Sequence, residues 1–271
     1  MLSLIQLKKK KKMNYGSILK WLSLSGITEC VGEKPINRFL NTDLHENKSK
    51  QFVAPESIQT PPKNKQDIET TFISQATNLA NNASDLTNLD SALNSFDGCS
   101  LRKTAQHTLS GMGISNQPTV LCLIDSPKSA DEKIGRLAAG DSGELLLKML
   151  KAIQLDCGTN TYLCPLIPWR LPGDRVPTET EVNLCLPFLK KRIELIQPQF
   201  ILIFGSLPTR GLLGIESISK ARQQNLSYSL STGNNIPVIA TFGPDMVMKG
   251  QSYRKNAWDD LQKLAKLISN N

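Results

Sequence analysis

Four runs of apolar residues, each about the length of a β-strand, alternate with amphipathic helical patterns in the second half of this chain. The runs cover residues 119–124, 161–164, 199–204 and 236–241. Strands that alternate with helices pair in parallel and have helices packed on both faces of the sheet. The pattern therefore predicts an α/β fold over residues 118–271, with three layers (α/β/α) around a central, mainly parallel four-stranded sheet.

The residues before this domain are predicted to add helices and a linker. Residues 13–32 contain a short amphipathic pattern, which predicts an N-terminal helical segment, and residues 33–65 are polar and aperiodic, as in a flexible linker. Residues 66–117 are expected to form a helical segment that leads into the α/β domain. Apolar residues recur there at helical spacing, in what reads as one helix from Asp67 to Phe96.

The formal charge of +8 does not by itself indicate a basic binding face. Five of these charges lie in the run from Lys8 to Lys12, which leaves +3 for the rest of the chain. The run follows an apolar start, the reverse of the order in a secretory signal. We interpret residues 1–12 as a basic leader or an upstream start. A basic arm that contacts nucleic acid is the alternative.

Cysteine usage and hydropathy favour a cytoplasmic protein. The six cysteines are scattered without a C-x-x-C pair, and Cys122 and Cys164 lie within apolar runs, so reduced structural thiols are expected. No apolar run approaches the roughly 20 residues that a membrane span requires, so no membrane partner is expected. The expected oligomeric state is a monomer.

Short motifs follow the predicted strands. Residues 124–128 read Ile-Asp-Ser-Pro-Lys, residues 169–175 read Trp-Arg-Leu-Pro-Gly-Asp-Arg, and residues 241–245 read Thr-Phe-Gly-Pro-Asp. A further motif, Gly-Arg-Leu-Ala-Ala-Gly, covers residues 135–140. Loops after parallel strands gather at one edge of a sheet, so a binding site is expected where these motifs meet.

In this order, the motifs resemble those of the uracil-DNA glycosylase superfamily, specifically the bacterial family 4 type. Residues 96–101, Phe-Asp-Gly-Cys-Ser-Leu, resemble the first motif of that family, and residues 255–260, Lys-Asn-Ala-Trp-Asp-Asp, resemble its closing helix. The resemblance implies a protein of base-excision DNA repair that binds DNA. Such a protein extrudes a base into a pocket and hydrolyses its N-glycosidic bond.

The resemblance also assigns the positions of a base pocket and a catalytic carboxylate. The pocket positions are Ile124, Asp125, Ser126, Ala138, Pro165 and Gly243. Asp125 stands where the family has a Glu, and it is the candidate catalytic residue because glycosidic cleavage uses a carboxylate near the sugar. Ile124 and Lys128 replace glycines of the same motif.

Three pocket positions lack the chemistry that the family uses for uracil. Ala138 replaces a Phe that stacks on the flipped base, and Pro165 replaces an Asn that reads the uracil edge. Gly243 replaces a His that donates to a uracil oxygen. The stacking on the base, the recognition of the uracil edge and the hydrogen bond to the uracil oxygen are therefore expected to be lost together.

Three basic residues are candidates for DNA contact. The resemblance places Arg170 and Arg175 beside the DNA groove, and Lys249 is a further candidate for a phosphate contact. For the two arginines, ion pairs within the loop to Asp174 or Glu179 are an equal alternative.

The cofactor of the family is not expected in this chain. A [4Fe–4S] cluster requires four cysteine ligands. Only Cys99 and Cys185 stand at matching positions, and Phe96 and Trp169 occupy the other two. The sequence therefore predicts no cluster and no metal site.

The combined prediction is a DNA-binding, uracil-DNA glycosylase-like protein with reduced or lost uracil excision. Two alternatives are open. One is an active DNA glycosylase for uracil or another damaged base, with Ser126, Lys128 and Asp245 as further polar groups of the pocket. The other is a non-catalytic interaction protein that keeps only the fold.

Overall fold

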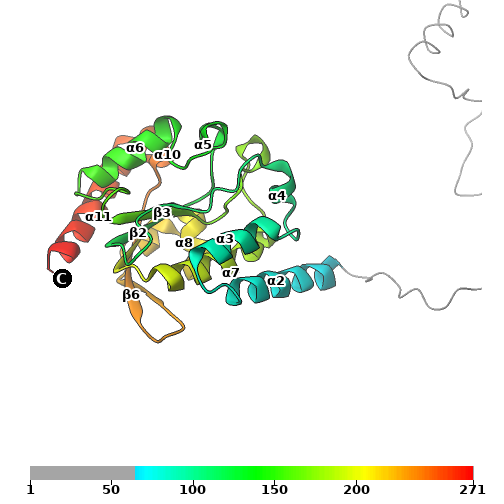
Figure 1. Ribbon diagram of the computed structural model, residues 1–271. Helices are drawn as coiled ribbons and strands as arrows, with labels where there is room; N and C mark the ends of the chain where they lie inside the picture. Colours follow the sequence, from blue (N-terminus) through cyan, green and yellow to red (C-terminus); the bar gives the residue numbers. More distant parts are fainter. Residues whose placement is uncertain (1–64, 271) are drawn as a thin grey trace, which may run out of the picture. The chain divides into compact units, whose positions relative to one another are not determined.

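The computed structural model of this chain describes residues 65–270 (Figure 1). The predictions for residues 1–12 and 13–32, and nearly all of the linker predicted over residues 33–65, fall outside the described residues. Within residues 65–270, no helix combines the length and the apolar character that crossing a membrane requires.

The described residues form one six-stranded sheet with the order β1-β3-β2-β4-β6-β5. Its strands are β1 (Met112–Gly113), β2 (Val120–Ile124), β3 (Thr161–Pro165), β4 (Phe200–Phe204), β5 (Leu226–Ser229) and β6 (Asn235–Thr241). The four central strands are parallel and are the four that the sequence predicts. The antiparallel edge strands β1 and β5 are additions to that prediction. They are short and only half buried, so neither produces an apolar run in the sequence.

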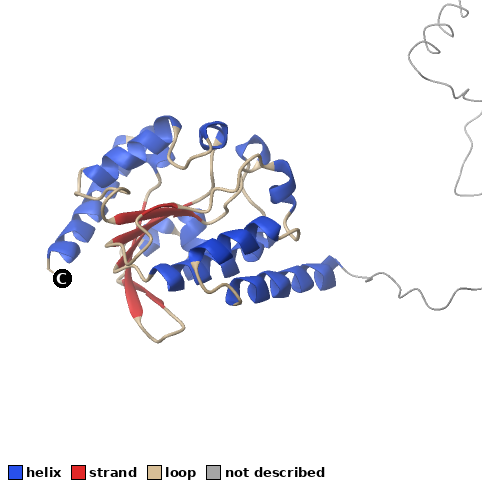
Figure 2. Ribbon diagram, in the orientation of Figure 1, coloured by secondary structure: helices blue, strands red, loops and turns tan. Residues whose placement is uncertain are grey.

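Helices cover both faces of the sheet, as Figure 2 shows. They are α2 (Lys65–Asn81), α3 (Leu86–Ser95), α4 (Ser100–Thr104), α5 (Ser129–Ile134), α6 (Gly140–Lys151), η1 (Pro172–Asp174), α7 (Glu179–Ile196), α8 (Ser206–Leu213), α9 (Ile218–Ala221), α10 (Pro244–Lys249) and α11 (Gln251–Ser269). Alternate residues of β2 divide the core: Leu121 and Leu123 pack with α2, α3 and α7, whereas Val120 and Cys122 pack with α6 and α11. The predicted three-layer α/β/α architecture is confirmed.

The helix expected from Asp67 to Phe96 is two helices, which corrects that prediction. α2 ends at Asn81 and α3 begins at Leu86. Asp85 is the N-cap of α3, and its carboxylate accepts a hydrogen bond from Asn88 N at 2.8 Å. A side chain that satisfies a free backbone N–H in this way starts a new helix rather than continuing the old one.

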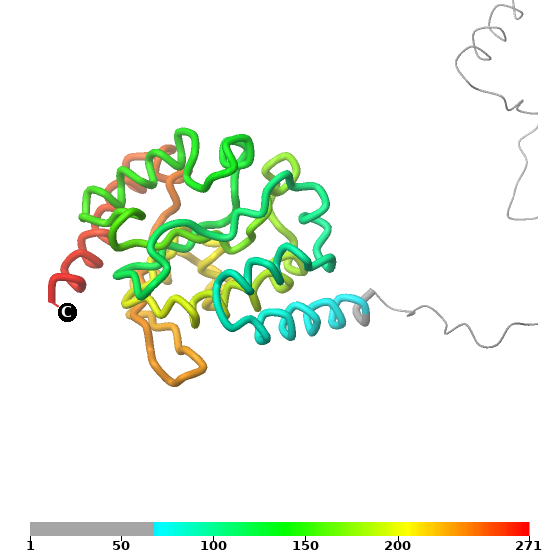
Figure 3. The backbone as a smooth tube through the Cα atoms, viewed as in Figure 1, coloured from blue at the N-terminus to red at the C-terminus, as the bar shows by residue number. Residues whose placement is uncertain are grey.

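The register of the central strands aligns their carboxyl ends. Ile124 of β2 pairs with Pro165 of β3, and Phe204 of β4 pairs with Thr241 of β6. The loops that follow these strands therefore meet at one edge of the sheet. The hairpin of β5 and β6 projects away from the helical layers, as the orange part of the tube in Figure 3 shows.

Candidate active site

A cavity of about 290 Å³ lies at this edge, where the loops after β2, β4 and β6 meet. Ile124, Asp125 and Ser126 line it from the end of β2, Ala138 from the loop before α6, and Gly243 from the start of α10. A larger depression of about 610 Å³ runs along the polar side of α2, away from the strand ends. Sites in open α/β sheets form at strand carboxyl ends, so the smaller cavity is the candidate site.

Pro165 is the one predicted pocket position that does not line this cavity. It is buried at the end of β3, beside Ile124. A proline there supplies neither a side-chain amide nor a backbone N–H. The structure thus brings five of the six predicted positions together, and the functional roles of all six stay predictions.

The carboxylate of Asp125 is the most unusual group in the cavity. Among the described residues, its Oδ1 atom is buried and has no hydrogen-bond partner. Burial raises the pKa of Asp125 from 3.8 to about 6; the positive charge of Lys128 lowers this pKa and the negative charge of Asp245 raises it. A buried carboxylate oxygen without a donor carries a free-energy cost unless a ligand supplies one.

Gly205, just after β4, is a residue that the motif comparison missed. Its φ of +100° favours glycine, and a Cβ atom there would lie 3.2 Å from Asp125 Oδ1. Because Gly205 has no side chain, the carboxylate of Asp125 fits between the carboxyl ends of β2 and β4. The only signal in the sequence is a glycine that ends an apolar run.

A polar bridge joins three sides of the cavity. Asp245 Oδ2 of α10 lies 3.4 Å from Lys128 Nζ, and Asp245 Oδ1 accepts a hydrogen bond of 2.5 Å from Ser142 Oγ of α6. All three side chains belong to residues that line the cavity. We call this group the Lys128–Asp245–Ser142 bridge. It places an amine, a carboxylate and a hydroxyl at the rim of the cavity. The amine is unexpected, because the resemblance to the family predicts a glycine at position 128.

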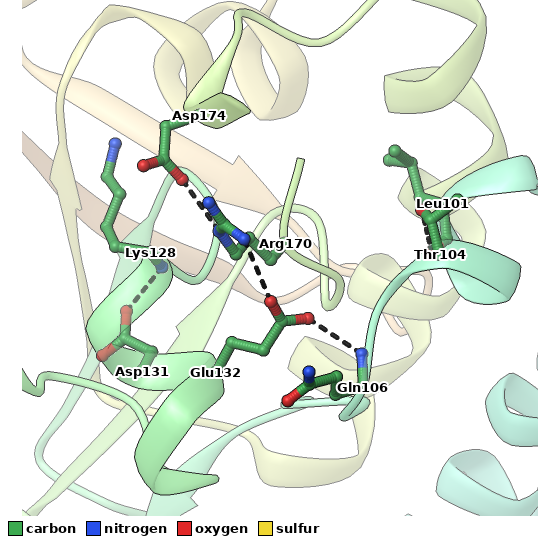
Figure 4. Close-up of polar contacts among 8 residues, drawn as sticks. All are labelled: Leu101, Thr104, Gln106, Lys128, Asp131, Glu132, Arg170 and Asp174. Atoms are coloured by element: carbon green, nitrogen blue, oxygen red, sulfur yellow. Dashed lines mark hydrogen bonds and ion pairs between the residues drawn. The ribbon is translucent and has the colours of Figure 1, made fainter. Parts of the chain in front are cut away.

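Asp131 fixes the shape of the loop that carries Lys128. Its Oδ2 accepts from Lys128 N at 2.7 Å, as drawn in Figure 4, and its Oδ1 accepts from Ala139 N at 2.7 Å. The carboxylate is buried and closes the turn between β2 and α6. The lining backbone is therefore held by a side chain that sequence motifs do not single out.

The comparisons with known proteins agree with this geometry. Residues 113–262, more than half of the chain, match the model of the uracil DNA glycosylase superfamily. This chain belongs to the uracil-DNA glycosylase superfamily. It is 26% identical over 176 residues to the type-4 uracil-DNA glycosylase of Saccharolobus solfataricus, which covers 63% of this chain and 81% of that protein.

Further similarities support the family 4 type. The type-4 uracil-DNA glycosylase of Archaeoglobus fulgidus is 27% identical over 174 residues, covering 62% of this chain and 86% of that protein. A DNA polymerase of Bacillus phage SP01 is 24% identical over 160 residues, which cover 59% of this chain and only 17% of the polymerase. The α/β domain is therefore a divergent glycosylase-like domain of this superfamily.

Arg170 is held inside the superfamily's loop. Its Nε donates to Asp174 Oδ1 at 3.1 Å and its Nη1 to Glu132 Oε2 at 3.2 Å (Figure 4). Glu132 is buried and also accepts from Gln106 N at 2.8 Å. The alternative of a pair with Asp174 is thus observed, and Glu132 is a partner that sequence reasoning missed. The network links the chain before β1, helix α5 and the loop after β3.

Arg175 is paired as well, but with Glu181 rather than Glu179. Two parallel hydrogen bonds of 2.8 and 2.5 Å join the guanidinium to the carboxylate. Arg175 lowers the pKa of Glu181, which also accepts from Thr178 N in a capping box at the start of α7. The predicted partner Glu179 was wrong, because the third helical residue is the one that turns back toward the cap.

Lys249 and Arg136 are exposed cations that are close in sequence to residues lining the cavity. Lys249 ends α10, and Arg136 lies two residues before Ala138. Neither makes an ion pair with any residue in the described range 65–270. Within that range their charges are not neutralised by a carboxylate, unlike the charges of Arg170 and Arg175.

The residues at the superfamily's cluster positions do not fit an iron–sulfur cluster. Phe96, Cys99, Trp169 and Cys185 are all buried in one apolar core cluster. The Phe96 ring packs on Phe188 at a centroid distance of 5.5 Å. Two thiols are half of a four-cysteine ligand set, and two aromatic side chains take the other positions. Across the described part of the chain, no three His, Cys, Asp or Glu side chains gather as a metal site.

Proposed function

We propose that this chain is a DNA-binding, uracil-DNA glycosylase-like protein of base-excision repair whose uracil excision is reduced or lost. One observation carries the proposal. Five of the positions that the resemblance assigns to a base pocket line one cavity, and Asp125 Oδ1 is buried there without a hydrogen-bond partner among the described residues, but the lining lacks the side chains expected to hold uracil. The expected location is the cytoplasm and the expected state a monomer.

The retained carboxylate of Asp125 is suited to stabilising the sugar during bond cleavage. A negative charge at Asp125 would stabilise the positive charge that develops on the sugar as the glycosidic bond breaks. Since the pKa of Asp125 is about 6, the group is mostly ionised at neutral pH. The Oδ1 atom of this shorter side chain is buried beside Gly205.

The side chains that would hold the departing base are missing. Gly243 supplies no side-chain donor for the departing base, and loss of one such donor costs about 10²–10³ in rate. Ala138 supplies no aromatic face, and loss of base stacking costs about 1–3 kcal/mol. These two losses are enough to make uracil a poor substrate while the DNA-binding frame persists.

DNA binding is proposed to use the free cations around the cavity. Lys249 and Arg136 are exposed and free of ion pairs within residues 65–270, so they can neutralise phosphates without breaking a contact. Arg170 and Arg175 keep the loop in shape instead.

A second candidate is an active glycosylase for a different damaged base. The observation that favours it is the buried Oδ1 of Asp125, which has no hydrogen-bond partner among the described residues, since a polar atom left in this way can be satisfied by a ligand other than uracil. Oligonucleotides that carry a panel of damaged bases test this candidate. Release of one damaged base but not of uracil would support it, and no release of any base would reject it.

The proposed function is tested with the full chain on uracil-containing single- and double-stranded oligonucleotides. We expect binding that weakens steeply as salt rises, together with little uracil release. Undamaged oligonucleotides of the same sequence are the control for binding. Rapid uracil release that disappears in Asp125→Ala would contradict the reduced activity, and absence of salt-sensitive binding would favour the non-catalytic interaction protein.

A further inference from the structure

Lys128 brings a primary amine to the cavity that the proposed function does not use. It is the fifth residue of the motif that starts at Ile124, and the superfamily resemblance expects a glycine at its position. Lys128 lines the same cavity as Asp125. Its Nζ is held at the rim by Asp245 at 3.4 Å, and 40% of the side chain is exposed.

The amine lies at a partly exposed rim, and hydrogen bonds fix the groups around it. Asp131 holds the backbone N–H of Lys128, so the direction in which the side chain leaves the loop is set. The Oδ1 atom of Asp125 is buried at the strand ends and has no hydrogen-bond partner in the described range. One short loop thus presents an amine and an unsatisfied carboxylate to a cavity of about 290 Å³.

An amine and a carboxylate in one pocket are suited to carbonyl chemistry. Lysine amines form imines with carbonyl carbons, and a nearby carboxylate can accept protons. DNA that has lost a base carries such a carbonyl, because the open-chain form of the abasic deoxyribose is an aldehyde at C1′. The sugar of a nucleotide bound in this pocket would meet Asp125, the candidate for the carboxylate near the sugar.

We propose that Lys128 is the nucleophile of an abasic-site lyase activity in this cavity. Lys128 Nζ gives one proton to Asp245 and adds, as the free amine, to C1′ of the open-chain sugar; Asp245 returns this proton to the hydroxyl, which leaves as water, and the product is a protonated imine. Asp125 takes a proton from C2′, which leaves an enamine. The electron pair then forms the C2′=C3′ double bond as the C3′–O bond breaks, and the 3′-side strand leaves with its 5′-phosphate. Water hydrolyses the imine, which restores the amine and leaves an unsaturated aldehyde on the other strand end. No oxidant or reductant is consumed.

The activity does not depend on uracil excision, since its substrate has already lost the base. It relies on the proposed DNA binding for the approach of the strand. Loss of the stacking and reading groups does not weaken it, because an abasic site has no base to stack or read. The replacement of a glycine by Lys128 and the loss of the uracil-holding groups are therefore compatible in one protein.

Borohydride trapping of the imine tests the proposal. The full chain is mixed with an oligonucleotide that carries a preformed abasic site, with and without sodium borohydride, and DNA affinity is measured in parallel. The expected result is a covalent protein–DNA complex that survives denaturation. Mass spectrometry should locate the modified peptide at residue 128.

Matched variants decide the outcome. Lys128→Arg keeps the positive charge next to Asp245 but cannot form the imine, so the trapped complex should be lost while DNA affinity is retained. Lys263→Gln, on the exposed side of α11, should trap like the wild type. Asp125→Asn should still trap but cleave the strand more slowly.

Two results would overturn the lyase proposal. The first is binding of abasic DNA without any trapped complex, which leaves the proposed DNA-binding function intact. The second is trapping that persists in Lys128→Arg, which would assign the imine to another amine such as one of Lys8 to Lys12. Absence of binding to any DNA would instead reject both the lyase and the proposed function.

Discussion

The carboxylate of Asp125 lies against Gly205, where the ends of β2 and β4 meet. A Cβ atom on Gly205 would be 3.2 Å from Asp125 Oδ1, and the φ of +100° at Gly205 is one that side chains with a Cβ rarely adopt. The glycine thus makes space for a carboxylate that has no donor among the described residues. The burial of this charge therefore depends on the ends of both β2 and β4, and not only on the motif at residues 124–128.

Substitution of Gly205 should be costly for this reason. Gly205→Ala adds a Cβ at a strained φ and against Asp125, so we expect a loss of about 1–3 kcal/mol in the free energy of unfolding. Gly214→Ala is the control, since Gly214 also has a positive φ but no atom near its Cβ position. Urea unfolding measures both. Equal losses in the two variants would mean that contact with Asp125 adds nothing.

The pKa of Asp125 predicts a pH-dependent contribution to stability. The folded-state pKa of about 6 exceeds the ordinary 3.8, so the folded state binds this proton more tightly. The stability from this residue is greatest below about pH 4 and falls as pH rises through 6. At about 1.4 kcal/mol per pKa unit, the fall is at most about 3 kcal/mol.

Asp125→Asn isolates this contribution because it removes the titration and keeps the shape. We expect the variant to gain stability relative to the wild type as pH rises from 4 to 7.5. Urea unfolding of both proteins across this range provides the measurement. A difference that does not change with pH would show that Asp125 titrates normally.

The sequence predicts the frame of this protein well and its polar contacts poorly. The apolar runs identified the parallel strands because β2, β3 and β4 are buried on both faces and β6 is mostly apolar. β5 escaped notice because its residues alternate between half-buried and exposed. Asp125, Ala138 and Gly243 follow from motif position, since strand ends converge on one edge. The partners of Arg170 and Arg175 depend on how loops fold against each other, which local patterns do not encode.

The pairing of Arg175 with Glu181 predicts a structural role for this arginine. Arg175→Ala leaves a buried carboxylate without its two strongest donors, so a loss of about 1–3 kcal/mol in stability is expected. Thermal and urea unfolding test this, with Arg136→Ala as the unpaired control. A variant as stable as the wild type but with weakened DNA binding would restore Arg175 as a phosphate contact.

Lys249, in contrast to Arg175, is expected to contribute to DNA binding and not to stability. Lys249→Ala removes an exposed cation with no ion pair in the described part of the chain, so stability should change by less than about 0.5 kcal/mol. The slope of log affinity for DNA against log salt should fall by about 1. Fluorescence anisotropy at several salt concentrations measures the slope, and an unchanged slope would exclude a phosphate contact.

The central claim is that the glycosylase frame is intact and that uracil-holding groups are missing from it. The most direct test is the single-turnover rate of uracil release after a donor is returned at position 243. The backbone there has an ordinary φ of −67°, and no atom lies closer than 3.9 Å to a Cβ. Gly243→His should raise the rate by up to about 10²–10³-fold, while Gly243→Ala should not. Rapid release by the wild type, or a folded and DNA-bound Gly243→His variant without any gain, would contradict the account.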